Sequence, residues 1–206
     1  MKPISEYNFR EIVGHFTLIQ GVIIDPQYDK YLGYCYIDQG EGISFRILSM
    51  INDNSVKDTY DEFVILRYNK EIELDIYEPS DTIVRSLTNK IDEIYKSNIN
   101  SFYRDKREYD PYRDKVFPDD LLLLTFITVN DKIESEPIWI RPSKTIEDNV
   151  IGITIEDGKY IHRNTQVIIL NKEVIFKNDN GESIPSIFAA TFDVLEKIVK
   201  EENNEI

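Results

Sequence analysis

The most apolar stretch of this chain reads Pro118-Asp-Asp-Leu-Leu-Leu-Leu-Thr-Phe-Ile-Thr-Val-Asn-Asp-Lys-Ile-Glu-Ser-Glu-Pro-Ile-Trp-Ile-Arg141. Residues 121–129 carry apolar side chains on both parities of an extended backbone, so they predict a strand that is covered on both faces and central in a sheet. Asn130-Asp131 then predicts a short turn, and residues 133–140 return as the second arm of a hairpin. Because Pro137 has no N–H to donate, we expect a bulge or an open edge at that position.

The sequence after this hairpin predicts further strands. Residues 149–156 alternate between apolar and polar side chains, and Asp157-Gly158 predicts a tight turn, since glycine tolerates the positive φ that such a turn requires. Two-residue pairing across this turn places His162 on the same face as the isoleucines of the first arm. Residues 165–170 and 173–177 continue the meander.

Two stretches have apolar residues at the three- and four-residue spacing of a helix that packs on a sheet. They are residues 80–99 and 185–200, and the second starts near Pro185, a residue that suits a first helical turn. The first half otherwise predicts a short helix from Ser5 and then antiparallel strands at 16–24, 31–37, 43–51, 62–68 and 71–76. The predicted fold class is therefore α+β: antiparallel meanders and hairpins with two packing helices.

The composition changes sharply at residues 103–118, which hold almost no aliphatic side chains and are punctuated by Pro111 and Pro118. This change predicts a boundary between an α+β lobe at 1–102 and a β-rich lobe with a C-terminal helix at 119–206, joined by a linker-like segment. A single continuous domain is the alternative.

Composition narrows the function classes. The 206 residues carry a net charge of −14, which repels nucleic acid and anionic membranes and attracts basic partners, although it also serves solubility alone. The one cysteine, Cys35, excludes an intrachain disulfide and a cysteine-based zinc site. We expect no membrane segment and a cytoplasmic location, because the start of the chain lacks the apolar core of a signal peptide. Abundant isoleucine, asparagine, lysine and tyrosine with little alanine suits an AT-rich genome, and we expect a bacterial protein.

Candidate metal ligands lie on the strand at 71–76. Glu71, Glu73 and Asp75 alternate with apolar residues, and neighbours two apart on a strand are about 6–7 Å apart, which suits a divalent cation. His162 would complete such a set. The more common reading of this pattern is the solvent face of a half-exposed strand, and we expect no cofactor.

The linker-like segment carries the candidate partner-binding residues. Aromatic and arginine side chains interleave there, a composition typical of binding hot spots, although mixed charge runs are usually solvated. These residues are Tyr103, Arg104, Arg107, Tyr109, Tyr112 and Arg113.

The sequence thus favours a non-catalytic, acidic protein-binding module that holds a basic partner, as an inhibitor, an immunity protein or a phage-encoded protein would. One alternative is a cation-dependent enzyme or small-ligand-binding domain that uses the carboxylate face. Another is a structural or assembly subunit that makes homo-oligomer contacts through the edge near Pro137.

Overall fold

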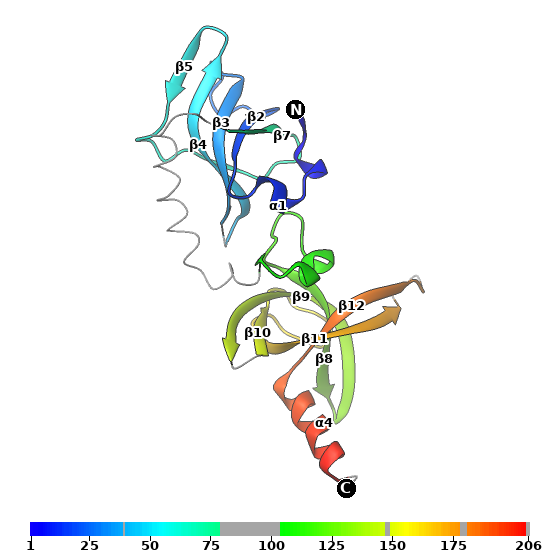
Figure 1. Cartoon of the computed structure of the whole chain (residues 1–206). Helices are drawn as coiled ribbons and strands as arrows, with labels where there is room; N and C mark the ends of the chain where they lie inside the picture. The colour runs from blue at the N-terminus through cyan, green and yellow to red at the C-terminus, as the bar shows by residue number, and fades with distance from the viewer. Residues whose placement is uncertain (39, 79–103, 147–148, 178–180, 205–206) are drawn as a thin grey trace. The chain divides into compact units, whose positions relative to one another are not determined.

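The computed structural model describes residues 1–38, 40–78, 104–146, 149–177 and 181–204. They belong to two compact units, each with its own hydrophobic core (Figure 1). Unit 1 comprises Met1–Asn98 and Lys115–Pro118, and unit 2 comprises Ile99–Asp114 and Asp119–Ile206.

The predicted α+β class is wrong, because strands make up 52% of the residues and helices only 13%. The helices in the described part of the chain are short: η1 Ile4–Glu6, α1 Phe9–Ile12, η2 Arg107–Tyr112 and α4 Phe192–Asn204. The predicted helix at 80–99 lies outside the described residues. The predicted helix at 185–200 begins only at Phe192, because strand β12, Ser183–Ala190, buries its residues Ile187 and Ala189 in the core of unit 2.

Unit 1 is an antiparallel sheet with the strand order β1-β7-β2-β3-β4-β5, and β6 also pairs with β4. The strands are β1 Lys2–Pro3, β2 Phe16–Gln20, β3 Lys30–Asp38, β4 Gly42–Asn52, β5 Ser55–Asp58, β6 Ile65–Arg67 and β7 Glu73–Tyr77. Strands β6 and β7 follow one another in the chain but do not pair with each other, because β6 pairs with β4, whereas β7 lies between β1 and β2.

The centre of this sheet is buried on both faces. Six of the nine residues of β3 and nine of the eleven residues of β4 are buried, which places these strands in the core. The larger apolar cluster includes Phe45 and Cys35, while Tyr34 and Leu48 form a smaller cluster with Phe16 and Tyr60. Helix α1 is capped by Asn8 rather than by a cap at Ser5.

Unit 2 is a closed barrel of five strands in the order β10-β11-β12-β8-β9. The strands not yet given are β8 Leu121–Val129, β9 Lys132–Ile146, β10 Asn149–Thr154 and β11 Gln166–Lys177. Neighbouring strands are antiparallel except β12 and β8, whose parallel pairing closes the barrel. The odd number of strands in a meander requires this one parallel contact.

The hairpin of β8 and β9 is confirmed, with Leu121 opposite Ile140. Asn130 and Asp131 have φ of 49° and 64°, as a two-residue turn between twisted strands requires. The prediction that β8 is covered on both faces is wrong at Leu122, which is 39% exposed. In a small closed barrel only the inward face of a strand is covered by the core.

The predicted turn at Asp157-Gly158 is also wrong. Strand β10 ends at Thr154 and pairs directly with β11, so that residues 155–165 form a longer loop. The predicted break at 171–172 is a shift of register within the continuous strand β11, between Leu170 and Glu173. Apolar alternation located these strands, but the turns depended on contacts far away in the chain.

No helix in the described part of the chain is both long enough and apolar enough to cross a membrane.

Candidate functional site

The segment at 103–118 was expected to be linker-like, and much of its described part is built into unit 2. Tyr109 of η2 is only 1% exposed and belongs to the core of the barrel. Tyr112 is partly buried and packs against the same core. Helix η2 contacts strands β8 and β12, and the burial of its aromatic side chains holds the segment against the barrel.

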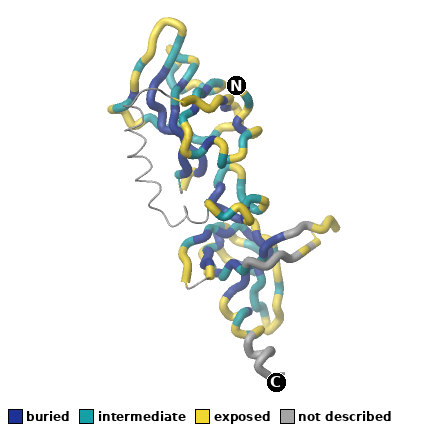
Figure 2. Tube along the Cα trace, in the orientation of Figure 1, coloured by how far each residue is buried: buried dark blue, intermediate teal, exposed yellow. Residues whose placement is uncertain are grey.

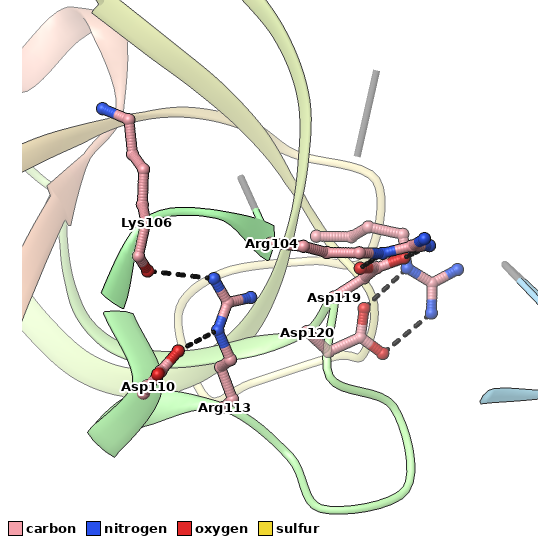
Figure 3. A network of polar contacts seen from close by, with 7 residues as sticks. Arg104, Lys106, Asp110, Arg113, Asp119 and Asp120 are labelled. Atoms are coloured by element: carbon pink, nitrogen blue, oxygen red, sulfur yellow. Dashed lines mark hydrogen bonds and ion pairs between the residues drawn. The ribbon is translucent and has the colours of Figure 1, made fainter. Parts of the chain in front are cut away.

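Two neighbouring aspartates immediately precede strand β8, and each accepts two hydrogen bonds from an arginine (Figure 3). Arg104 donates from Nε and Nη2 to the two carboxylate oxygens of Asp119, at 2.6 and 2.7 Å. Arg141, in β9, donates in the same way to Asp120, at 2.6 and 2.8 Å. This bidentate geometry is the strong form of a carboxylate–guanidinium pair.

Both carboxylates are deeply buried, with Asp119 5% and Asp120 3% exposed. Burial raises the pKa of Asp120, and the hydrogen bond and charge of Arg141 oppose this rise. The hydrogen bond to Asp120 in turn raises the pKa of Arg141. Since guanidinium groups engage both oxygens of each carboxylate, these aspartates are poorly placed to act as acid–base groups or metal ligands. The pairs are structural.

A third arginine, Arg113, forms hydrogen bonds with other residues of the same segment (Figure 3). Arg113 donates from Nε to the carboxylate of Asp110 at 3.0 Å and from Nη2 to the carbonyl of Lys106 at 3.3 Å. The side chain of Arg113 is only 3% exposed. The backbone N–H of Asp114 donates to the carbonyl of Asp120 at 3.0 Å, which anchors the end of the segment to β8.

The predicted partner-binding residues thus have internal roles in most cases. The side chains of Arg104, Tyr109 and Arg113 are occupied within unit 2. Arg107 is exposed, whereas Tyr103 lies outside the described residues. Binding of a partner by this set stays a prediction, but the buried members could contact one only if the segment opened.

The predicted carboxylate face exists, without a metal-binding arrangement. Glu73 and Asp75 are exposed on β7, and Glu71 is exposed just before it. Between them Ile72 and Leu74 are fully buried. In the described part of the chain, no group of three or more His, Cys, Asp or Glu side chains could hold a metal ion.

His162 lies in unit 2, whereas Glu71, Glu73 and Asp75 lie in unit 1. It is not on an apolar face, because its side chain is 86% exposed in the loop at 155–165, 3.5 Å from Asp157. The prediction of its position relied on the tight turn that does not form. In unit 1, burial raises the pKa of the Cys35 thiol, so the thiolate needed for nucleophilic chemistry is disfavoured.

Sequence reasoning missed Glu136, which holds the loop at 155–165. Its carboxylate accepts hydrogen bonds from the backbone N–H groups of Lys159, Tyr160 and Ile161 at 2.6–2.8 Å. A Cβ at Gly158 would lie 2.5 Å from Oε1 of Glu136, so glycine is needed there for close approach. Glutamate on an exposed strand gives no sequence signal for this contact.

The paired aspartates were also missed as a site, although their positions carry a weak signal. Asp119 and Asp120 immediately precede an apolar strand, and Arg141 follows the apolar end of its partner strand. In the β8–β9 hairpin Leu121 lies opposite Ile140, so the residues just before β8 lie close to Arg141. They are the buried acidic residues among those that the structure describes, so the remaining described carboxylates are at least partly accessible to water.

Comparison with known proteins gave no match: no protein-family model, no curated protein and no solved structure is significantly similar to this chain.

Proposed function

We propose that this protein is a non-catalytic binding module that uses its acidic surface to hold a basic protein, in the manner of an inhibitor or an immunity protein. The proposal sets it in the cytoplasm, with no cofactor. The observation that carries it is the partition of charge. The buried carboxylates of the described residues, Asp119 and Asp120, are each neutralised by an arginine.

Each of these internal ion pairs holds one positive and one negative charge, so neither contributes to the net charge of −14. The excess negative charge of the described residues therefore lies on carboxylates that are at least partly accessible to water. Acidic side chains outnumber basic ones in the sequence of each unit, and the field of each unit therefore attracts cations. Such a field accelerates encounter with a basic protein and disfavours encounter with nucleic acid.

The test is native mass spectrometry of the tagged protein after gentle recovery from the cells in which it naturally occurs. We expect a complex of fixed stoichiometry with a protein that is rich in lysine and arginine. Because complementary charge drives the association, its rate should fall with ionic strength. Recovery of the chain alone, or of a partner whose association rate does not respond to salt, would contradict the proposal.

Charge reversal on the protein supplies the matched test. Glu71→Lys and Glu73→Lys change exposed side chains beside a sheet whose buried residues are untouched. If the field as a whole attracts the partner, the double variant slows association while the melting temperature stays within a few degrees of the original. Unchanged association would show that the overall field does not steer the encounter with the partner.

A further inference from the structure

Strand β5 forms one margin of the sheet of unit 1 (Figure 1). One of its edges pairs with β4, from Asn52↔Ser55 to Ser49↔Asp58. No described strand pairs with its other edge. Edge strands present unpaired backbone groups, which are templates for another extended chain.

The register identifies which backbone groups point outward. The N–H of Thr59 donates to the carbonyl of Leu48 at 2.8 Å, so these two residues form a hydrogen-bonded pair. Bonded and non-bonded pairs alternate along an antiparallel ladder, and the register of β5 on β4 has no shift. The backbone N–H and C=O groups of Val56 and Asp58 therefore point away from β4, toward the outer edge.

Two large apolar side chains are exposed along the same margin. Val56, in β5, is 64% exposed, and Phe63, in the loop that follows, is 72% exposed. The turn that joins β4 to β5 is exposed as well (Figure 2). The guanidinium of Arg46 lies 4.4 Å from the ring centroid of Phe63. Arg46 is itself held by the carbonyls of Val64 and Tyr60, at 3.4 and 3.5 Å.

The ring of Phe63 is thus held at the surface by a fixed cation. An aromatic side chain that is already ordered loses little conformational entropy when a partner covers it, so it is a favourable anchor for binding.

The charges around this margin are acidic. Asp53, Asp58, Asp61 and Glu62 are all exposed. Lys57 is engaged by Glu62 at 3.4 Å, so the basic side chain of β5 is largely compensated. The margin consequently offers backbone hydrogen-bonding groups, two apolar contacts and an excess of negative charge.

We propose that this margin of unit 1, formed by β5 and residues 61–63, docks an extended basic segment of a partner protein as an additional strand. This inference rests on the proposed function and specifies its mode of binding. The backbone of the added strand bonds to Val56 and Asp58, its lysine or arginine side chains meet the carboxylates, and its apolar side chains cover Val56 and Phe63. In the described part of the chain, the closed barrel of unit 2 has no terminal strand, and its unpaired edges are confined to strand ends that extend beyond a neighbour, such as residues 183–187 of β12.

The test uses a synthetic peptide of alternating lysine and valine, titrated into the isotope-labelled full chain and followed by NMR. We expect the largest amide shifts at Val56 and Asp58, with smaller ones at residues 61–63. A peptide of alternating glutamate and valine has the same strand propensity with the opposite charge, and we expect it to bind at least tenfold more weakly. Equal binding of the two peptides would overturn the assignment of charge.

Variants at Val56 separate the backbone contact from the side-chain contact. Val56→Pro removes an N–H that β4 does not use, so the sheet should survive while the dissociation constant of the basic peptide rises at least tenfold. Val56→Thr keeps the N–H and the β-branched shape, and should raise it less than threefold. Protection of the Cys35 thiol from alkylation reports that unit 1 is still folded.

If Val56→Pro fails to fold, Asp61→Asn with Glu62→Gln tests the same margin, and Glu71→Gln with Glu73→Gln is the control with an equal charge change. Peptide shifts on β7 or in unit 2, or equal weakening by the two charge pairs, would overturn the docking edge and leave the proposed function standing. Failure of both the peptide and any natural basic partner to bind would overturn both.

Discussion

Both units consist mainly of antiparallel strand pairs, but only unit 2 closes its strands into a barrel. In unit 2 the parallel pairing of β8 with β12 closes the barrel, whereas the sheet of unit 1 ends at β1 on one side and β5 on the other. Closure leaves no terminal strand in the barrel, so unpaired edges occur there only where a strand extends beyond its neighbour, as residues 183–187 of β12 do. The docking proposal uses this difference, because it places the added strand on the terminal strand β5 of unit 1.

Their interiors differ as well. Unit 1 buries mainly aromatic and aliphatic side chains with a neutral thiol, while unit 2 also buries the carboxylates of its two Arg–Asp pairs beside its apolar core. Each unit also has its own reporter, since the chain has a single cysteine, Cys35 in unit 1, and a single tryptophan, Trp139 in unit 2. Thiol reactivity and fluorescence can therefore follow the units separately.

The largest effect is expected from Phe45→Ala in unit 1. Phe45 is fully buried in the larger apolar cluster, and truncation of such a side chain lowers the free energy of unfolding by about 3–5 kcal/mol. We expect Cys35 to be alkylated roughly a hundredfold faster or more, because the thiol reacts when unit 1 opens. Equal rates in the variant and the original protein would show that Cys35 is exposed by a smaller local motion.

Unit 2 should respond most to Arg141→Met. The variant leaves the carboxylate of Asp120 buried without its partner, which costs about 3 kcal/mol; the value is at the low end because the Arg141 side chain is 26% exposed. The midpoint of urea unfolding, measured by Trp139 fluorescence, should fall accordingly.

The double variant Asp120→Leu with Arg141→Met is the control for this prediction. Replacement of both partners by apolar groups removes the unpaired charge, so most of the lost stability should return. A double variant as unstable as Arg141→Met alone would mean that the packing of the arginine stem, rather than its charge, stabilises this end of the barrel.

The sequence predicted features that are set by neighbouring residues. Alternation located most of the strands, and the apolar run at 121–129 with the polar pair Asn130-Asp131 gave the first hairpin of the barrel. Prediction from alternation failed where contacts between residues far apart in the chain determine the secondary structure. The stretch at 185–190 has a helix-compatible spacing, but as β12 it pairs with β11 and β8, and these contacts override local propensity.

The expected position of one candidate residue, His162, was wrong for the same physical reason. His162 would have faced the core in a two-residue hairpin, but Glu136 captures three backbone N–H groups of its loop. The exposed carboxylates on β7 were located by simple alternation with Ile72 and Leu74. The pairing of Arg104 with Asp119 depends on the path of the intervening chain, which no periodicity reveals.

A smaller effect is expected in unit 2 from Glu136→Gln. The amide keeps one acceptor oxygen but presents an NH2 group to at least one of the three backbone donors, and loss of a charged hydrogen bond at this partly exposed site costs about 1–2 kcal/mol. We expect faster amide exchange at Lys159, Tyr160 and Ile161. Glu134→Gln on the same strand is the matched control, and an equal change there would contradict the role of Glu136.

The smallest expected effect is the dependence of unit 2 on the protonation of Asp120. Because burial raises the pKa of this carboxyl in the folded state, the folded protein binds its proton more readily than the unfolded chain, whose value is 3.8. Ionisation of Asp120 therefore costs stability above the folded-state pKa, and this cost disappears as the pH falls through it toward 3.8. The sign is opposite for Asp157, whose pKa is lowered, chiefly by a hydrogen bond from the backbone N–H of Arg163.

A pH series on paired variants isolates the contribution of Asp120. The free energy of unfolding of the original protein minus that of Asp120→Asn should rise as the pH falls from neutral to 3.8, because only the original protein loses an unfavourable buried charge. The corresponding difference for Asp157→Asn should fall over the acidic part of the series, since that carboxylate is favoured in the folded state. Two differences with the same slope would show that Arg141 outweighs burial at Asp120, so that the pair in unit 2 behaves as a surface ion pair does.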